Sequence, residues 1–181
     1  MASAQTGSFY LTETITMPAA SAASSRFQGT VDLSSYVSVP SGMAISIDQV
    51  DFIWQTGADF GQELSAMLAV NGALSTQLTD QNPGTVFVRA DDNSLIASGA
   101  LNIDAVNNIG THVADIYPDS FGPAALSDTF LCVNDTLFLV AGNDASATLA
   151  EISCTVRIRA RIVKLSSRDW MAIAIQSTAT D

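Results

Sequence analysis

Charged residues are scarce in this sequence, and their scarcity is the first constraint on what the protein does. They make up 14% of the 181 residues, whereas hydrophobic residues make up 48%. Soluble domains average about 25% charged residues. No apolar stretch approaches the ~20 residues that a membrane-spanning helix requires, so a bilayer span does not account for the deficit. We expect much of the protein surface to be in contact with other subunits.

Residues that carry catalysis or bind metals are also few. The two cysteines, Cys132 and Cys154, lie in apolar strand-like patterns, so we expect buried free thiols rather than a disulfide, and we exclude a zinc site. The only histidine, His112, has no nucleophile signature beside it, and no glycine-rich phosphate loop follows a strand. We therefore predict that the protein is not an enzyme and that it carries no cofactor.

Basic residues are few and unevenly placed. The chain holds 7 Lys and Arg residues against 18 Asp and Glu residues, a formal net charge of −11. Residues 1–150 contain 15 acids and 2 bases, a net charge of −13, and residues 151–181 contain 3 acids and 5 bases, a net charge of +2. This balance argues against direct nucleic-acid binding, which needs cations to neutralise phosphates. Residues 1–25 hold no Lys or Arg, so we expect no secretory signal, and assembly in the cytoplasm.

The strongest positive signal is the alternation from Glu151 to Ile162. Every even position in this run is apolar, and every odd position is polar or charged. Period two is typical of a strand that has one face on a core and the other facing water or a partner. The polar face carries three successive arginines, and so indicates the surface where an interaction is expected.

These arginines belong to a set of candidate subunit-interface residues near the C-terminus, which comprises Arg157, Arg159, Arg161, Lys164, Arg168 and Trp170. Three interpretations of the basic face remain open. It is a solvated strand face, or it binds carboxylates of the acidic 1–150 region of a neighbouring subunit, or it contacts the anionic head groups of an internal membrane. The sequence indicates no catalytic, cofactor-binding or metal-binding residues.

Further strand-like segments recur along the chain with turn signals between them. Within Met43–Trp54 the apolar parity switches, which predicts a β-bulge near Asp48 and Gln49. Leu64–Val70 is interpreted as a strand rather than a helix, because Asn71-Gly72, a strong hairpin signal, follows it. The other segments expected to contain strands are 9–17, 27–39, 74–78, 86–88, 95–97, 130–133 and 136–141.

The sequence thus indicates an all-β protein, a single jelly-roll sandwich or barrel of roughly eight to ten strands with no long helix. Such a fold closes or doubles its sheets to hide their edges. Trp170–Ile175 is apolar at both parities and is interpreted as a strand covered on both faces. We expect one domain over residues 1–181, in which residues 1–7 are a flexible N-terminal arm and residues 99–128 are a long irregular loop region.

A second function stays open, namely a carbohydrate-binding or adhesive β-sandwich. Its candidates are aromatic side chains that stack on sugars: Tyr10, Tyr36, Trp54, Tyr117 and Phe121. Asp91-Asp92-Asn93, Asp115 to Asp119 and Asn143-Asp144 supply oxygen atoms of the kind that bind Ca²⁺, but Asp and Asn are also the default residues of turns. An aromatic content of only 7% weakens this alternative.

The whole pattern resembles one family. The chain is β-only, short of charge, and richer in Asp than Glu and in Arg than Lys. In this it is similar to the small major capsid protein of the icosahedral, internal-membrane viruses of halophilic archaea, whose shells are built from upright single jelly rolls. The segment Arg161-Ile162-Val163-Lys164-Leu165, followed by Asp169-Trp170, is suggestive of that family.

The resemblance implies a structural role in the virion, without enzymatic activity and without direct contact to nucleic acid. The implied partners are copies of this chain, in homo- or hetero-dimers that form pseudo-hexameric capsomers, and a second capsid protein. A lipid vesicle that encloses double-stranded DNA would lie beneath the shell. These points are expectations of the resemblance, beside the lateral association that the charge pattern predicts.

Overall fold

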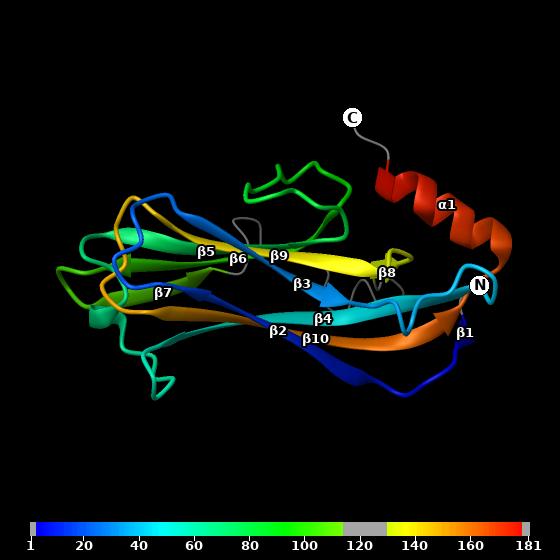
Figure 1. Ribbon diagram of the computed structural model, residues 1–181, viewed down its shortest axis with the longest axis horizontal. Coiled ribbons are helices and arrows are strands. Elements are labelled where there is room, and N and C mark those ends of the chain that lie inside the picture. The colour runs from blue at the N-terminus through cyan, green and yellow to red at the C-terminus, as the bar shows by residue number, and fades with distance from the viewer. Residues whose placement is uncertain (1–2, 114–129, 179–181) are drawn as a thin grey trace.

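The computed structural model describes residues 3–113 and 130–178, which form two facing antiparallel sheets with a helix at one end (Figure 1). The elements in chain order are β1 (Ser3–Ala4), β2 (Phe9–Met17), β3 (Arg26–Asp32), β4 (Met43–Thr56), a 3-10 turn η1 (Leu64–Ala66), β5 (Gly72–Thr79), β6 (Leu95–Asp104), β7 (Ile109–Val113), β8 (Phe130–Cys132), β9 (Thr136–Asp144), β10 (Ile152–Lys164) and α1 (Ser167–Thr178). The predicted all-β class is confirmed.

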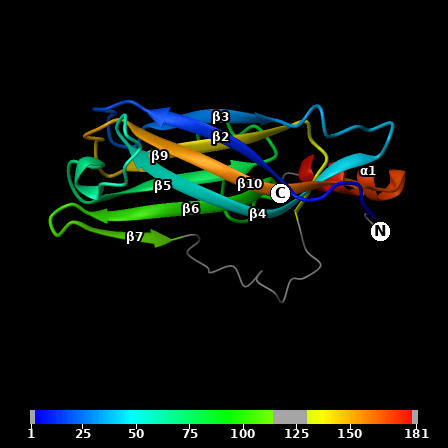
Figure 2. The same cartoon turned by 90° about the horizontal axis from the view of Figure 1, so that it is seen from below.

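The order of the strands is that of a jelly roll. Sheet A runs β2–β10–β4–β8, with β1 beside the far end of β10, and sheet B runs β3–β9–β5–β6–β7. The pairing is nested, because β2 pairs with β10, β3 with β9, β4 with β8, and β5 with β6. A nested ladder folded over into two sheets is the double-sheet jelly roll, so the predicted architecture is confirmed. Figure 2 shows how the long strands of both sheets run along the same axis.

The alternation along β10 forms one wall of the core between the sheets. The five side chains at even positions from Ile152 to Ala160 are all 0% exposed, whereas Arg157 between them is exposed. Burying a Val or Ile side chain stabilises a protein by about 1.5–3 kcal/mol, so this strand face anchors the sandwich. Cys132 and Cys154 are buried free thiols, as predicted, and burial raises the pKa of each thiol to about 12.

The parity switch in β4 is a β-bulge at the predicted place. Arg159 of β10 pairs with Gln49, but the next residue, Ala160, pairs with Ile47, so Asp48 is the extra residue on β4. The extra residue compensates for the change from odd to even apolar positions, so apolar side chains on both sides of Asp48 point into the core. A bulge also bends its strand and increases the local twist, which the long strands of sheet A need in order to fold over sheet B.

The interpretation of Trp170–Ile175 as a strand is wrong, because this segment lies in α1. Apolar residues at both parities also fit a period of 3.6, in which positions three and four apart share a face. Trp170 and Ile173 pack on sheet A, whereas Met171 and Ile175 are exposed on the other side of the helix. The two parities are therefore two sides of a helix rather than two faces of a strand.

Helix α1 packs on one end of sheet A. Ala44 of β4 and Val163 of β10 are buried with the helix, whereas the adjacent Ile45 and Ile162 contact the main core. Successive side chains of a strand point to opposite faces, so α1 packs on β4 and β10 from the side opposite to Ile45 and Ile162. Because the strands twist, Figure 1 shows α1 on the same side of sheet A as sheet B. Further along the same strands the side chains that point away from the core, such as Tyr10, Asp51 and Arg157, are exposed.

Two expectations about irregular segments are wrong for the described residues. Ser3 and Ala4 pair with β10, and the Gln5 N–H donates to the Ile162 carbonyl at 2.8 Å, so the N-terminal segment is held against the sheet rather than forming a flexible arm. Residues 99–113 are not an irregular loop, because β6 and β7 form a hairpin at the edge of sheet B. Residues 114–129, the rest of that expected loop, lie outside the described residues.

The segment before β5 and the segment after it also differ from prediction. Leu64–Val70 is not a strand, because it begins with the turn η1 and forms only an isolated bridge from Leu68 to Thr148, so Asn71-Gly72 joins no hairpin. Gly72 has another role: a Cβ at this position would collide with the carbonyl oxygen of Asp144 on β9. Val86–Val88 is not a strand either, since it lies in the long loop between β5 and β6.

Candidate functional site

The side of β2, β10 and β4 that points away from the core carries a surface that we call the basic face. It consists of Tyr10, Thr12, Thr14, Gln49, Asp51, Ile53, Thr155, Arg157 and Arg159. Ile53, Thr155 and Arg159 are half-buried, and the other members are exposed. The register places Arg157 between Thr12 and Asp51, and Arg159 between Tyr10 and Gln49. Because directly paired residues share a face, these side chains lie side by side outside the sandwich.

The two arginines of the basic face have no carboxylate partner among the described residues. The Arg157 guanidinium lies over the Tyr10 ring, 4.9 Å from its centroid. Asp51, which is opposite Arg157, instead accepts the Gln49 amide at 2.9 and 3.1 Å. Both guanidinium groups therefore keep donors that are free to bind an acceptor on another molecule.

Arg161, the third arginine of the predicted stripe, acts within the chain. Its Nη2 donates to Asp48 Oδ1 at 2.9 Å, and the Asp48 side chain is only 11% exposed. The bulge thus turns a carboxylate toward β10, and Arg161 neutralises it. Two other basic residues are also paired, Arg26 with Asp144 and Arg89 with Asp91.

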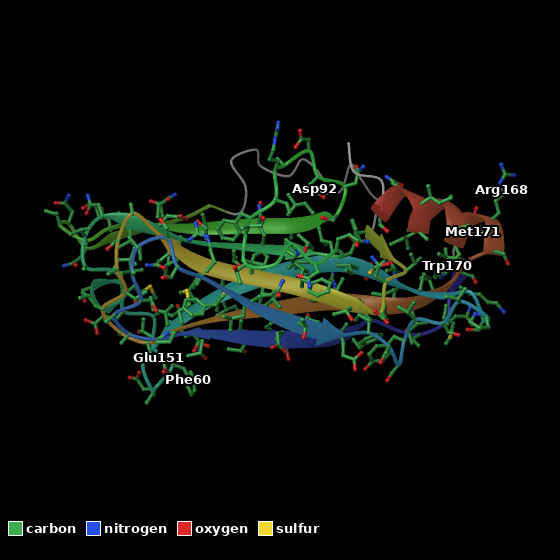
Figure 3. All side chains as sticks on the ribbon, turned by 45° about the horizontal axis from the view of Figure 1, so that its top comes forward. Phe60, Asp92, Glu151, Arg168, Trp170 and Met171 are labelled. Carbon is green, nitrogen blue, oxygen red and sulfur yellow. The ribbon has the colours of Figure 1, made fainter. Side chains whose placement is uncertain are left out.

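The remaining candidates lie at the helix end of the molecule, away from the basic face. Lys164 is exposed at the end of β10, and Arg168 is exposed in the first turn of α1 (Figure 3). Trp170 is half-buried against sheet A, and its indole N–H is buried without an acceptor in the described part of the chain. The structure therefore divides the six predicted residues into a basic face, an internal ion pair and a helix end.

The outer face of sheet B differs, because the β5–β6 loop crosses it, as the loop above β5 and β9 in Figure 1 shows. Gln77 of β5 exchanges two hydrogen bonds with the backbone of Val88, at 2.8 and 3.0 Å. The Arg26 guanidinium of β3 lies 4.5 Å from the centre of the Phe87 ring. Val140 of β9, between these strands, is consequently 1% exposed although it lies outside the main core. Of the two sheets, sheet A is thus the one with a face that the described segments leave largely uncovered.

One functional candidate was missed in the sequence. Asp80, at the end of β5, is 3% exposed, and one carboxylate oxygen has no hydrogen-bond donor among the described residues. The sequence Asp80-Gln81-Asn82-Pro83-Gly84 is typical of an exposed turn, so no local signal indicates the burial. The contacts that bury Asp80 come from segments distant in sequence.

Other chemistry is sparse over the described part of the chain. No group of three or more His, Cys, Asp and Glu side chains gathers there as a metal centre. His112 lies in β7, and Asp115 and Asp119 lie outside the described residues. No helix in the described segments is long and apolar enough to cross a membrane.

Fold and surface define the class of this protein: a single jelly roll with one covered and one uncovered sheet face. No family model matches the chain, and no curated protein matches it. A solved chain of Desmodium yellow mottle tymovirus aligns with 89% of this chain and 91% of its own length, at 10% sequence identity and a TM-score of 0.29. Because that score is low, the jelly-roll assignment rests on the strand order alone.

Proposed function

We propose that this chain is a structural subunit of a viral capsid and that it acts by lateral association, without catalysis. The observation that carries the proposal is the bare basic face on a complete jelly roll, with two arginines that lack an ion partner among the described residues. Double-sheet jelly rolls build viral capsids, and also lectins and cupins. The fold therefore limits the function to a few classes of protein. Among capsid proteins, lectins and cupins, the exposed basic face favours the capsid protein.

The charge distribution supports contact between copies of the chain. Residues 1–150 carry a net charge of −13, and the basic face presents two free guanidinium groups. A basic face on one copy and an acidic surface on the next form a heterologous contact, which closes into a ring under rotational symmetry. The net charge of −11 opposes this packing at low salt, so we expect screening to promote assembly.

The size of the basic face indicates that several weak contacts act together. The basic face extends from Thr155 to Arg159 of β10, and at ~3.3 Å per residue and ~4.8 Å per strand the three strands project roughly 240 Å² there. A standard stable interface buries about 800 Å² per partner. The basic face alone is too small for that, so we expect the helix end with Lys164 and Arg168 to add a second contact.

We extend the proposal to the finer points of the resemblance. The chain would stand upright in an icosahedral shell of a virus of a halophilic archaeon, in capsomers shared with a second capsid protein and above an internal membrane. It would assemble in the host cytoplasm and reside in the virion. The net charge of −11 supports a shell protein that leaves the nucleic acid to other components.

The carbohydrate-binding alternative has less support from the described residues. Trp54 is 4% exposed in the core, and Tyr36 packs on Phe9 with ring centroids 5.3 Å apart. Tyr10 is 55% exposed, but the Arg157 guanidinium lies over its ring. Tyr117 and Phe121 lie outside the described residues. Neither Trp54 nor Tyr36 thus offers a free ring on which a sugar stacks.

The test is the molar mass of the purified protein by light scattering, from low to molar salt. Growth from monomer or dimer into large, regular particles or capsomers supports the shell function. A monomer at every salt and protein concentration contradicts self-association of this chain. Binding on a glycan array by a protein that stays monomeric would favour the carbohydrate-binding alternative instead.

A further inference from the structure

The β5–β6 loop, residues 80–94, covers the outer face of sheet B mainly through polar contacts. Gln28 of β3 donates to the Gly84 carbonyl at 2.7 Å. Gln77 of β5 holds the middle of the loop through its two hydrogen bonds with Val88. A segment that buries little apolar surface of its own is among the first parts of a protein to open locally.

The base of this loop is closed at Asp80. The Asp80 N–H donates to the Ser94 carbonyl at 3.0 Å, and the Asn134 side-chain amide donates to the Asp80 carbonyl at 2.8 Å. Asp80 therefore joins the start of the loop, its return to β6 and the turn after β8. The residue is 3% exposed, and its Oδ1 receives no hydrogen bond from the described residues.

Neither a lysine nor an arginine of the chain neutralises this carboxylate. Three of the seven basic residues are arginines paired with other carboxylates, and two more lie on the basic face. The last two, Lys164 and Arg168, are exposed at the helix end. An ionised Asp80 is consequently a buried charge without a partner, which is costly, whereas protonated Asp80 is neutral.

The groups around Asp80 do not relieve this cost. The Ser94 N–H and hydroxyl donate to Asp92 Oδ1 at 2.8 and 2.6 Å and hold the pKa of Asp92 below its usual range, so Asp92 stays negative. Burial raises the pKa of the Cys132 thiol to about 12, so it stays neutral. The residues of α1 that line the recess beside Asp80 are Ile173, Gln176 and Ser177, which carry no charge. Burial, with a contribution from Asp92, raises the pKa of Asp80 to about 6.

We propose that residues 80–94 are a proton-controlled cover on sheet B, closed while Asp80 is protonated and loosened when Asp80 ionises. Opening the base of the loop lets water reach the carboxylate, so the ionised form favours the open state. Opening also uncovers Val140 of β9, which is 1% exposed in the closed state. A second sheet face thus becomes accessible at higher pH, and this switch is independent of the proposed shell function.

The direction and size of the effect follow from linkage. In the open loop Asp80 has the ordinary pKa of an aspartate, about 3.9. Since its pKa is about 6 in the closed state, the closed state is fully favoured below about pH 4 and loses stability as the pH rises through about 6. These two values predict a roughly tenfold rise in the opening equilibrium from pH 5 to pH 7.5.

The test is hydrogen exchange of the full chain, measured by mass spectrometry at pH 5 and pH 7.5 and corrected for the intrinsic pH dependence of amide exchange. We expect peptides from residues 80–94 to lose protection roughly tenfold at the higher pH, while peptides from β10 stay protected. Asp80→Asn keeps the shape of the side chain and cannot ionise, so its loop should stay protected at both pH values. Asp80→Ser is the second neutral variant, for use where the amide impairs folding.

Two control variants separate Asp80 from other titrating groups. Asp59→Asn removes a carboxylate from an exposed turn, and His112→Gln removes the only histidine, a residue type that ordinarily titrates near pH 6.5. Both should keep the wild-type pH dependence. Equal protection of residues 80–94 at the two pH values in the wild type would overturn the proposal. A pH response that persists in the neutral Asp80 variants, or an equal loss of protection in β10, would overturn it as well.

Discussion

Reversal of the two free arginines, Arg157→Glu with Arg159→Glu, should leave the monomer folded and prevent its assembly. Within the monomer the change removes the contact of Arg157 with Tyr10, which at an exposed site is worth about 0.5–1 kcal/mol. It also places a glutamate directly opposite Asp51, a like-charge pair that costs roughly 0.2–1 kcal/mol. The total of about 1–2 kcal/mol is small against the usual stability of 5–15 kcal/mol.

Between subunits the same change is expected to cost far more. Breaking a buried, hydrogen-bonded charge pair in an interface costs about 2–5 kcal/mol, much of it from the partner charge left unpaired. Two such pairs give at least about 4 kcal/mol per contact, which is on the order of a thousandfold in the dissociation constant. The expected cost per contact between subunits is larger than the expected loss of monomer stability. The experiment is therefore decisive, because the variant should remain folded and yet fail to assemble.

The assay combines circular dichroism and urea unfolding of the monomer with light scattering at a salt concentration that assembles the wild type. Arg89→Glu is the control, since it reverses a single arginine whose side chain is 88% exposed in the β5–β6 loop, off the basic face. The control should assemble normally. Particles of wild-type size and yield from the double variant would refute the role of the basic face.

Two further predictions concern the fold around the site. Arg161→Ala should lower the free energy of unfolding by about 1.5–3 kcal/mol, because Asp48 loses a charged hydrogen bond at 11% exposure. Urea unfolding measures the loss, and a change no larger than that of Arg157→Ala would contradict the pairing. Gly42→Ala should cost about 1–3 kcal/mol, because Gly42 has a φ of 69° and a Cβ there lies 2.6 Å from the Leu165 carbonyl oxygen. An unchanged Tm would show that the link between β4 and the start of α1 is not strained.

The alternation within strands was predictable because it depends only on residues that are adjacent in the sequence. The run from Ile152 to Ala160 needs only a period of two to indicate its buried face, and the parity switch at Asp48 needs only its own strand. The jelly-roll class follows from many such strands without a second element type. Where the apolar pattern fits both a strand period of 2 and a helix period of 3.6, the sequence does not distinguish strand from helix. Trp170–Ile175 is the clearest case.

The sequence predicted where the candidate site lies, but it did not predict which of its arginines are free and which are paired within the chain. Three arginines at alternate positions do share one face of β10, as the sequence requires. Their environments differ because other chain segments differ beside each of them: Tyr10 of β2 lies under Arg157, Asp48 at the bulge pairs with Arg161, and α1 covers the strand two residues later. The sequence of the three arginines and their immediate neighbours does not predict any of these contacts.

The sequence by itself determined the strands with a long, unambiguous alternation, the apolar side of those strands, and that the chain carries too little charge for its surface. Tertiary structure alone decided which outer faces are covered and which stay bare. It packed the β5–β6 loop on sheet B and α1 on sheet A, and it buried Asp80 between segments far apart in the chain. The reason is physical: periodicity depends on the geometry of adjacent residues, whereas the covering of a face depends on contacts that form only when distant segments meet.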